Sequence, residues 1–471
     1  MIALLALAVR IVPAATRGSG SWAMEPNGDS AAYLGLANGI KRGCGFAFWT
    51  GTNCAAPETN RTPAYPLFVA LIPGLRTVLI AQGVLWSLLC FLVGDFTASV
   101  AGAGAGYCAA GIIAADIPSI VSSNEIMSET LCMALLVGAV LVGLEIIRSR
   151  GSAVRLCGLA AAMSSMLGLA LLVRPIAEFL IPLFIAAPLF MTRASNGSRV
   201  LMSTLAAAGP VLCATVWSLR NYSVAGVAAI STIGGLNFFY YRAVGTLAFA
   251  SHAGWAQTLA RTQPLPDVDL GAQAWSVVAH HPFAFMAMTL WSFSYLCWVP
   301  SRAPLAQVLG IASVLRFEDP GSVRLEAFIH QLWAGSFTST ISGRGVDSSI
   351  VLLSLLVLQL VMIGFTWAGV ALALRKYAKL PSELRRGVLF AVAIAMVTLL
   401  LASGPEAVAR FRVPAMPLLA FLAGVGWFGN HPRRSSQRGF SASEGELSPD
   451  LSATAERCAG AESGTGFTAN A

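Results

Sequence analysis

The sequence predicts an all-α, polytopic integral membrane protein with about 10–12 transmembrane helices. Of its 471 residues, 56% are hydrophobic and 11% are charged, and the mean hydropathy is +0.71. Soluble domains carry about 25% charged residues, so this composition is typical of a protein that lies mostly in lipid. The long runs of Leu, Ala, Val and Ile lack the alternation of a barrel strand, which leaves helices as the spanning elements.

Ten apolar stretches are candidates for membrane spans, at roughly 20 residues per crossing. We predict spans at residues 1–16, 77–97, 104–121, 129–147, 156–173, 175–192, 200–219, 349–374, 387–403 and 411–428. A further apolar stretch, 282–300, is either interfacial or re-entrant, or pairs with a weaker span at 303–316. Its tryptophan and tyrosine residues favour the membrane interface.

Lys and Arg cluster in short segments beside the predicted spans, at residues 148–155, 193–199, 375–386 and 433–438. The positive-inside rule places these clusters in the cytoplasm. Counting crossings from them then places a first loop, about residues 17–76, and an external or interfacial region, about residues 220–348, on the extracytoplasmic side. The net charge of +8 is therefore a topology signal, and no nucleic-acid binding is predicted.

The membrane-embedded part, residues 1–428, is predicted to form one domain. After it the composition turns to Ser, Gly, Glu and Ala with almost no aromatic residues. Such a composition cannot build a packed core, so residues 429–471 are predicted to be a disordered cytoplasmic tail.

The first external loop holds a polar segment close to the predicted spans. Asp29 opens a short helix predicted over residues 30–38, and Tyr33 lies one turn further on, facing the same way. As the residue before a helix, Asp29 can cap the free N–H groups of the first turn. As a carboxylate beside a membrane, it can instead act as a general base. Residue types alone leave both interpretations open.

Cys44 and Cys54 both lie in this loop. In an oxidising compartment they would form a disulfide that rigidifies the loop, and the alternative is two free thiols. The other seven of the nine cysteines are scattered, without the spacing of metal ligands. No metal site is predicted, no cofactor is required, and a divalent cation has no support from the residues.

Charged residues at the outer ends of spans are the remaining candidates, because charges near lipid are costly and often functional. Glu129 lies at the predicted outer start of the fourth span, where it either stabilises the helix dipole or contacts a substrate or metal. Several arginines on one membrane face could bind the phosphate of a lipid-linked substrate, or extend toward lipid headgroups. They are Arg61, Arg174, Arg220, Arg410 and Arg412, besides Arg76 and Arg242.

Short motifs mark the predicted outer face. They are GDSAAY at 28–33, RTPAYPLF at 61–68, SETL at 128–131, LVRP at 172–175, the segment 217–237 and RFRVPAMP at 410–417. Together, and in this order, they resemble the GT-C superfamily of polyprenyl-phosphate-sugar-dependent glycosyltransferases, specifically the bacterial relatives of protein O-mannosyltransferases and aminoarabinose transferases. The resemblance covers most of residues 1–428. The position after Asp29, which is often acidic in that family, is Ser30 here.

This resemblance implies an inverting glycosyltransferase that moves a sugar from a polyprenyl-phosphate donor to a hydroxyl group of an acceptor lipid, glycan or protein. It implies Asp29 as the general base, Glu129 as a second residue of the catalytic cleft, and outer arginines that stabilise the leaving phosphate. It also implies a bacterial inner (plasma) membrane, with the active face extracytoplasmic. Substrate-binding roles are expected for Tyr33, Arg61, Tyr65, Arg174, Arg220, Asn221, Asn237, Arg410 and Arg412.

Two other classes of protein share this composition. A transporter or lipid flippase is the main alternative, and a noncatalytic membrane scaffold is another. Transporters hold ionisable groups near the bilayer midplane on broken helices. Here the charged residues lie mostly at span ends on one predicted face, with Asp95 and Glu178 as partial exceptions. The pattern therefore favours the enzyme, and a scaffold would leave the external Asp and Arg residues unexplained.

Overall fold

The computed structural model describes residues 1–17, 28–149, 151–265, 269–301, 346–405 and 408–429, with only the backbone for residues 16–17 and 346–353. The predicted tail beyond residue 429 and the weaker predicted span at 303–316 lie outside the described residues. So do parts of the two predicted external segments, at residues 18–27, 266–268 and 302–345.

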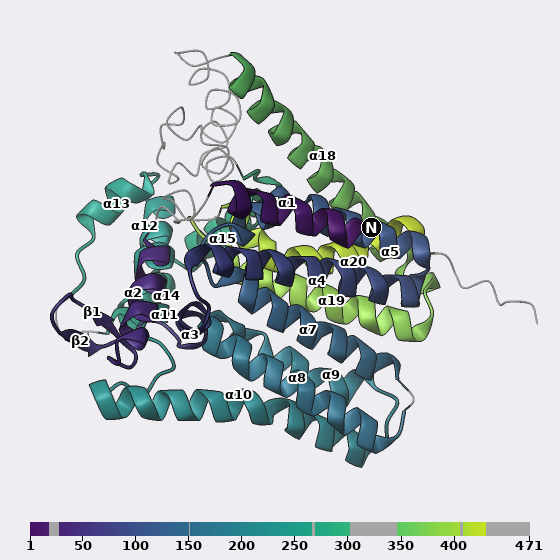
Figure 1. Ribbon diagram of the computed structural model, residues 1–471, viewed down its shortest axis with the longest axis horizontal. Helices are drawn as coiled ribbons and strands as arrows, with labels where there is room; N and C mark the ends of the chain where they lie inside the picture. The colour runs from purple at the N-terminus through teal and green to yellow at the C-terminus, as the bar shows by residue number, and fades with distance from the viewer. Residues whose placement is uncertain (18–27, 150, 266–268, 302–345, 406–407, 430–471) are drawn as a thin grey trace, which may run out of the picture. The chain divides into compact units, whose positions relative to one another are not determined.

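The described residues are almost entirely helical, which confirms the all-α prediction (Figure 1). Seven described helices are long and apolar enough to cross a membrane, and an eighth crossing arises if the bent pair α5–α6 is one span. Each of the ten predicted spans coincides with one of these or with the shorter apolar helices α1 and η2–α9. The elements are α1 (Ile2–Arg17), α4 (Leu75–Ala101), α5 (Ala103–Ala115), α6 (Ile117–Ser123), α7 (Glu129–Arg148), α8 (Ala153–Val173), η2 (Pro175–Phe179), α9 (Ile181–Met191), α10 (Asn196–Ala225), α18 (Val346–Lys376), α19 (Ser382–Ala402), η6 (Ala409–Ala415) and α20 (Met416–Phe428).

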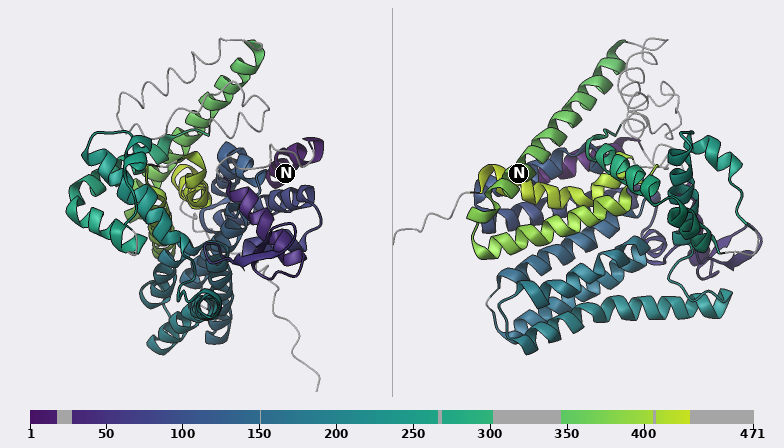
Figure 2. Two further views of the ribbon diagram at one scale, coloured as in Figure 1. Left: turned by 90° about the vertical axis from the view of Figure 1, so that its left-hand side faces the viewer. Right: turned by 180° about the vertical axis from the view of Figure 1, so that it is seen from behind.

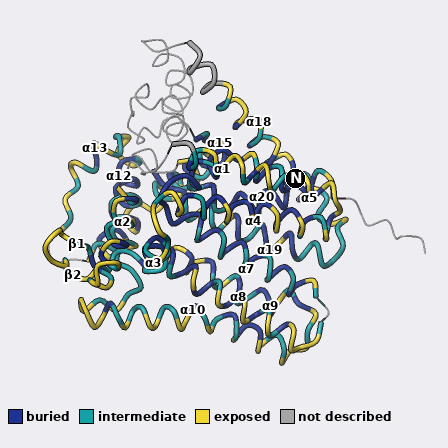
Figure 3. The backbone as a smooth tube through the Cα atoms, in the orientation of Figure 1, coloured by how far each residue is buried: buried dark blue, intermediate teal, exposed yellow. Residues whose placement is uncertain are grey.

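The long helices run side by side in Figures 1 and 2. α4 packs against α1, α5, α7 and α20, α8 lies between α7 and α10, and α19 contacts α7, α9 and α20. Buried residues concentrate along the inner helices, whereas one side of α10 is exposed along its length (Figure 3). The exposed residues there include Val211, Leu212 and Val216, as expected of a helix that faces lipid.

The predicted span at 104–121 is not one straight helix. α5 and α6 meet at Asp116 with a bend of 56°. Asp116 starts the second helix because its carboxylate accepts a hydrogen bond of 3.0 Å from the backbone N–H of Ser119, as an N-cap does. Pro118, in the first turn of α6, has no N–H with which to continue α5. Apolar length alone does not predict such a break.

Arg10 of α1 binds carbonyl groups beside this break. Its guanidinium donates to the carbonyl oxygens of Ile113 (2.9 Å) and Ala114 (3.4 Å) and to Ser119 Oγ (2.8 Å). The Arg10 side chain is fully buried and lies over the Trp86 ring, 5.7 Å from its centroid. Polar contacts therefore fix α1 to α5 and α6, and they offset the cost of burying the charge.

Short elements gather at one end of the long helices, at the left in Figure 1. They are α2 (Asp29–Lys41), β1 (Ala47–Trp49), β2 (Cys54–Pro57), α3 (Ala64–Leu71), α11 (Ile233–Asn237), η3 (Phe238–Ala243), α12 (Val244–Ala250), α13 (Trp255–Arg261) and α14 (Leu270–His280). β1 and β2 form an antiparallel hairpin, which the Cys44–Cys54 disulfide closes. Of the two alternatives that the sequence leaves for these cysteines, the structure has the disulfide.

α2 differs from the predicted helix at both ends. It runs from Asp29 to Lys41, against a predicted range of 30–38. Gly39 lies inside the helix, where the missing Cβ lets the helix lie directly against the backbone of β1. The N-cap position belongs to Gly28, and no side chain caps this helix. The interpretation of Asp29 as an N-cap is therefore wrong.

α15 (Pro282–Trp298) is the apolar stretch whose place in the membrane the sequence leaves open. At 17 residues it is shorter than the seven candidate spans. It packs against α12, α18, α19 and η6, and Phe283, Met286 and Leu290 form an exposed apolar stripe along it. The interfacial, re-entrant and paired-span interpretations all stay predictions.

We expect the Cys44–Cys54 disulfide in protein purified from the membrane. Denatured protein should take up seven maleimide groups before reduction and nine after it, because two of the nine cysteines are blocked. Intact-mass spectrometry measures the difference. The control is a Cys44→Ser/Cys54→Ser double variant, whose adduct count should not change on reduction. Nine adducts on the unreduced wild-type protein would contradict the disulfide.

Candidate functional site

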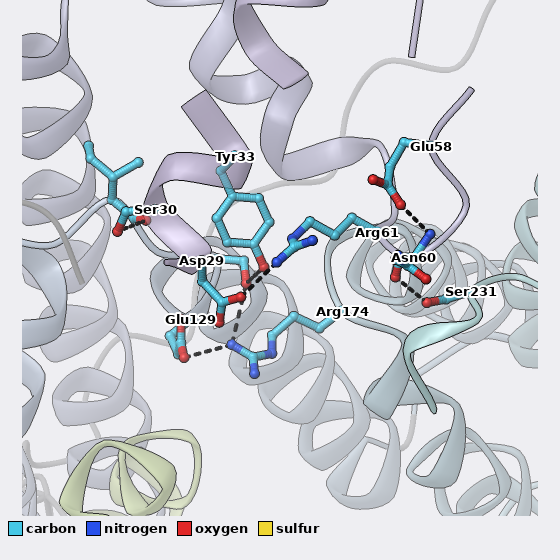
Figure 4. Close-up of polar contacts among 11 residues, drawn as sticks. Asp29, Ser30, Tyr33, Glu58, Asn60, Arg61, Glu129, Arg174 and Ser231 are labelled. Carbon is cyan, nitrogen blue, oxygen red and sulfur yellow. Dashed lines mark hydrogen bonds and ion pairs between the residues drawn. The ribbon is translucent and has the colours of Figure 1, made fainter. Parts of the chain in front are cut away.

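The first charged contact of the site joins α2 to the chain before α3. Arg61 Nη2 lies 2.8 Å from Asp29 Oδ1, and the two side chains are 18% and 34% exposed (Figure 4). The Arg61 guanidinium also lies over the Tyr33 ring, 5.7 Å from its centroid. Within the described part of the chain, Asp29 Oδ2 has no hydrogen-bond partner. One carboxylate oxygen is thus held in place while the other stays available.

Tyr33 connects this pair to a second pair of charges. Its hydroxyl shares a hydrogen bond of 3.0 Å with Ser128 Oγ, and Arg174 Nη1 donates to the same oxygen at 3.3 Å. Arg174 Nη1 also lies 2.7 Å from Glu129 Oε1, an ion pair drawn in Figure 4. A continuous series of polar contacts therefore runs from the start of α2 to the start of α7 and the end of α8.

A third guanidinium approaches from the C-terminal part of the sequence. Arg410 of η6 has its Nε 3.9 Å from Glu129 Oε1. The Glu129 side chain is 3% exposed, so it is enclosed between Arg174 and Arg410, which are 29% and 15% exposed. With Arg61, three guanidinium groups accompany two carboxylates, and the cluster carries an excess of positive charge. Such a cluster suits a phosphate, which guanidinium groups bind through paired N–H donors.

The local sequence explains how these side chains meet. Gly28 adopts a φ of 87°, which residues with a Cβ avoid, and this turn puts Asp29 on the first turn of α2. Glu129 is the first residue of α7. Arg174 follows the last residue of α8, just where Pro175 starts η2. Each charge thus stands at the end of an apolar or amphipathic helix, and the ends converge.

Two tyrosines pack edge to face beside the charges. The ring centroids of Tyr33 and Tyr65 are 4.8 Å apart. Tyr65 is fully buried and donates to Gln82 Oε1 at 2.8 Å, and Gln82 donates in turn to the carbonyl oxygens of Ser123 (3.1 Å) and Glu125 (2.7 Å). Burial raises the pKa of the Tyr33 and Tyr65 phenols, so both stay neutral. This support fixes the segment that leads into α7.

Arg220, at the end of α10, holds the hairpin that precedes Arg61. It donates to the carbonyl oxygens of Glu58 (2.6 Å) and Phe46 (3.1 Å). Its guanidinium also lies over the ring of Trp217, 4.9 Å from the centroid. Arg220 therefore joins the end of α10 to the backbone of the first loop.

Asn60, directly before Arg61, is held by the segment that follows α10. Ser231 Oγ donates to the Asn60 carbonyl oxygen, and Thr232 Oγ1 donates to Asn60 Oδ1. The backbone N–H of Thr232 donates to the carbonyl oxygen of Thr59 at 3.1 Å. Figure 4 shows Asn60 and Ser231 beside Arg61. These contacts limit how far Arg61 can move from Asp29.

The structure brings together six of the residues predicted for the site: Asp29, Tyr33, Arg61, Glu129, Arg174 and Arg410. Tyr65 lies next to them, but its hydroxyl is bound to Gln82. Their roles in catalysis and substrate binding stay predictions.

The other predicted substrate-binding residues make different contacts. Arg220 binds the hairpin, and Asn221 is buried with its amide donating to the carbonyl oxygens of residues 229 and 230. Arg412 is buried in the bundle, where Nη1 donates to the carbonyl oxygens of residues 296 (2.8 Å) and 299 (3.0 Å). Asn237 is exposed at the end of α11. No contact in the described part of the chain links these four side chains to the Glu129 carboxylate.

Three residues that connect the site are absent from the predicted set. Ser128 bridges Tyr33 and Arg174, Gln82 supports Tyr65, and Asn60 positions the chain at Arg61. Gln82 lies inside a predicted span, and a polar residue there is the signal that could have identified it. Ser128 precedes Glu129 at a helix start, where serine is usually a cap. Its position in the sequence therefore does not indicate that it connects Tyr33 to Arg174.

Ser30, at the position that is often acidic in the GT-C enzymes, points away from the charges. It is buried, and its Oγ donates to the carbonyl oxygen of Ile126 at 3.0 Å. Ser30 therefore joins the start of α2 to the segment before α7. Asp29 is therefore the acidic residue in the first turn of α2.

Comparisons with known proteins give similarity at the level of structure only. No family model matches the sequence, and no curated protein matches it. The oligosaccharyltransferase of Archaeoglobus fulgidus in the apo form is similar with a TM-score of 0.46 and 14% identity, over 90% of this chain and 49% of that one. ArnT from Cupriavidus metallidurans bound to undecaprenyl phosphate is similar with a TM-score of 0.40 and 14% identity, over 90% and 77%. This chain spans about half the length of the oligosaccharyltransferase, and scores this low support no functional argument.

We expect Glu129 and Arg174 to stabilise the fold as a pair. Glu129→Gln leaves the Arg174 charge without its carboxylate and should lower the free energy of unfolding by about 3 kcal/mol. Arg174→Gln should cost a similar amount. The double variant should lose clearly less than the sum, because neither charge is then left alone. Unfolding in SDS mixed micelles, followed by tryptophan fluorescence, measures all three.

The matched control for this cycle is the ion pair between Glu145 and Arg148 on the same helix. Both side chains are partly exposed, so Glu145→Gln should cost less than about 1 kcal/mol. If the losses at Glu129 and Arg174 simply add, the two charges do not act as a pair.

Proposed function

We propose that the protein is an inverting glycosyltransferase, which transfers a sugar from a polyprenyl-phosphate donor to an acceptor hydroxyl with Asp29 as the general base. The observation that carries the proposal is a partly exposed carboxylate beside an excess of guanidinium groups. A base for the hydroxyl and positive charge for the leaving phosphate are the two requirements of this reaction. The order of the sequence motifs supports the same conclusion.

In the proposed reaction, Asp29 accepts the proton of the acceptor hydroxyl. The hydroxyl oxygen forms a bond to the anomeric carbon while the bond from this carbon to the phosphate oxygen breaks. The electron pair of the broken bond leaves with the polyprenyl phosphate, and attack from the opposite side inverts the anomeric centre. Arg174 and Arg410 stabilise the negative charge that develops on the phosphate. Arg61 holds Asp29 in the orientation for proton transfer.

Glu129 has a positioning role in this mechanism. Its side chain is 3% exposed and lies against Arg174 and Arg410, so the arginines stand between it and a substrate. A buried carboxylate between two guanidinium groups fixes their orientation before the substrate binds, which reduces reorganisation during the reaction. The resemblance predicts Glu129 in the catalytic cleft. In the proposed mechanism, Glu129 acts through Arg174 and Arg410 and does not touch the substrate.

We place the active face on the extracytoplasmic side of a bacterial inner membrane. The Cys44–Cys54 disulfide supports this side, because disulfides persist in oxidising compartments. The basic cluster at residues 148–155 supports it as well, because it follows the end of α7 opposite to Glu129. A donor confined to the bilayer explains why the base is attached to a membrane bundle, while the acceptor arrives from outside.

The alternative function is a transporter or lipid flippase. The bent pair α5–α6 favours it, because broken helices carry binding sites in transporters. Against it, Arg10 already binds the carbonyl groups at this break and uses them to anchor α1. The charges of the cluster at Asp29 and Arg174 instead lie at helix ends and are partly exposed.

Asp29→Asn should abolish transfer and leave the fold intact. The amide oxygen still accepts a hydrogen bond from Arg61 but cannot take up a proton, so the rate should fall by at least about 10²-fold. The assay uses purified protein in liposomes with a panel of polyprenyl-phosphate hexoses and pentoses, and it measures released polyprenyl phosphate.

Asp269→Asn is the control for this change. Asp269 is an exposed N-cap of α14 that accepts from the backbone N–H of Ala272, and asparagine can cap as well. Its transfer rate should equal that of the wild-type protein. A wild-type transfer rate in Asp29→Asn would refute the role of Asp29 as the general base. Movement of a labelled donor across the liposome membrane, without release of polyprenyl phosphate, would favour the flippase.

A further inference from the structure

An open apolar groove lies between α2, α3 and the start of α4. The wall on α2 consists of Leu34, Ala37, Asn38 and Lys41, which follow the i, i+3, i+4, i+7 spacing of one helix face. α3 and α4 supply apolar residues such as Val69 to the other walls. The groove has a volume of about 230 Å³ and is open to the surface, so it is smaller than most small-molecule sites, which hold about 300–1,000 Å³.

The groove lies along a face of α2 that the protein covers only in part, because Ala37 is buried and Leu34 half-buried while Asn38 and Lys41 are exposed. On another face of the helix, Gly35 lies against the Phe48 ring and Gly39 lies against the carbonyl group of Ala47. That face is closed by the disulfide-linked hairpin. The groove face instead opens beside Leu75, where the candidate membrane span α4 begins. Hydrocarbon chains of the bilayer can therefore reach it.

The charges around the groove are basic. Lys41 lies at its wall, and Arg76, which donates to the carbonyl oxygen of Ala15, directly follows the wall residue Leu75. Arg42 instead lies over the Trp49 ring of the hairpin. Between residues 28 and 80 the carboxylates belong to Asp29, which pairs with Arg61, and to Glu58, which accepts a hydrogen bond from Asn60. No carboxylate in the described part of the chain pairs with Lys41. An apolar groove with a basic edge at the start of a span complements an anionic lipid.

We propose that this groove binds an anionic phospholipid of the bilayer, with an acyl chain along Leu34 and Ala37 and the phosphate at Lys41 and Asn38. The lipid is not the sugar donor. Asp29 and Lys41 are twelve residues apart on α2, which is about 18 Å along a helix, too far for the phosphate at Lys41 to be the one that reacts. The proposal therefore does not rest on the proposed function. A bound lipid anchors the far end of the helix that carries Asp29 and Tyr33.

Thermal unfolding of the full chain in mixed micelles tests the proposal. Phosphatidylglycerol should raise the Tm of the delipidated wild-type protein about 3–5 °C more than phosphatidylcholine with the same acyl chains. The reason is that phosphatidylglycerol binds in the groove of the folded protein, and a ligand of the folded state stabilises it. Lys41→Glu should abolish this difference, and Lys41→Arg should retain it. Ile72→Trp, which fills the groove from the residue after α3, should also reduce this difference in Tm.

Lys379→Glu is the matched control, because Lys379 is an exposed lysine at the end of η5 (Tyr377–Lys379), and it should keep the full difference. Lys41→Gln replaces Lys41→Glu if the latter does not fold. An equal Tm in both lipids for the wild-type protein would overturn the proposal. So would a retained phosphatidylglycerol preference in Lys41→Glu, or an equal loss in Lys379→Glu, which would indicate a general charge effect.

Discussion

The ion pair between Glu129 and Arg174 is the contact on which the rest of the site depends. A carboxylate that is 3% exposed needs a cation, and Arg174 supplies it from the end of another helix at 2.7 Å. Arg410 adds a second positive charge from η6. Ser128, next to Glu129, then links Arg174 to Tyr33 and so to α2. Because either charge alone would be costly to bury, the ends of α7, α8 and η6 stay together, and the polar face has a fixed geometry.

The sequence predicts the positions of the membrane-spanning helices well, but it does not predict the break at Asp116 or the ends of α2. Apolar length is a property of a continuous stretch, so all ten predicted spans coincide with helices. The break at Asp116 depends on one carboxylate capping a new helix, which overrides the apolar pattern around it. Gly39 lies inside α2 against β1, and the sequence alone does not distinguish a glycine that permits close packing from one that ends a helix.

Within the candidate site, the motifs predict which residues to consider but not which of them meet. Ser128 bonds to residues 95 and 46 positions away in the sequence, so its partners cannot be identified from its neighbours. Arg410 and Arg412 look equivalent in the sequence. On the 3-10 helix η6, at about three residues per turn, they point to different sides, Arg410 toward Glu129 and Arg412 toward carbonyl groups in the bundle. The hydrogen bonds of Arg412 therefore join η6 to the end of α15.

The contacts of Arg10 have a consequence for biogenesis. Arg10 is synthesised 103 residues before Ile113 and 109 before Ser119, the groups that satisfy its charge. A nascent α1 thus enters the membrane with the carbonyl oxygen of Ala6 as the one partner of Arg10 already synthesised among those described, and an incompletely bound guanidinium in lipid costs several kcal/mol. The contacts of Arg10 with α5 and α6 can form only after both of these helices have been synthesised, so α1 reaches its final packing later than its own synthesis.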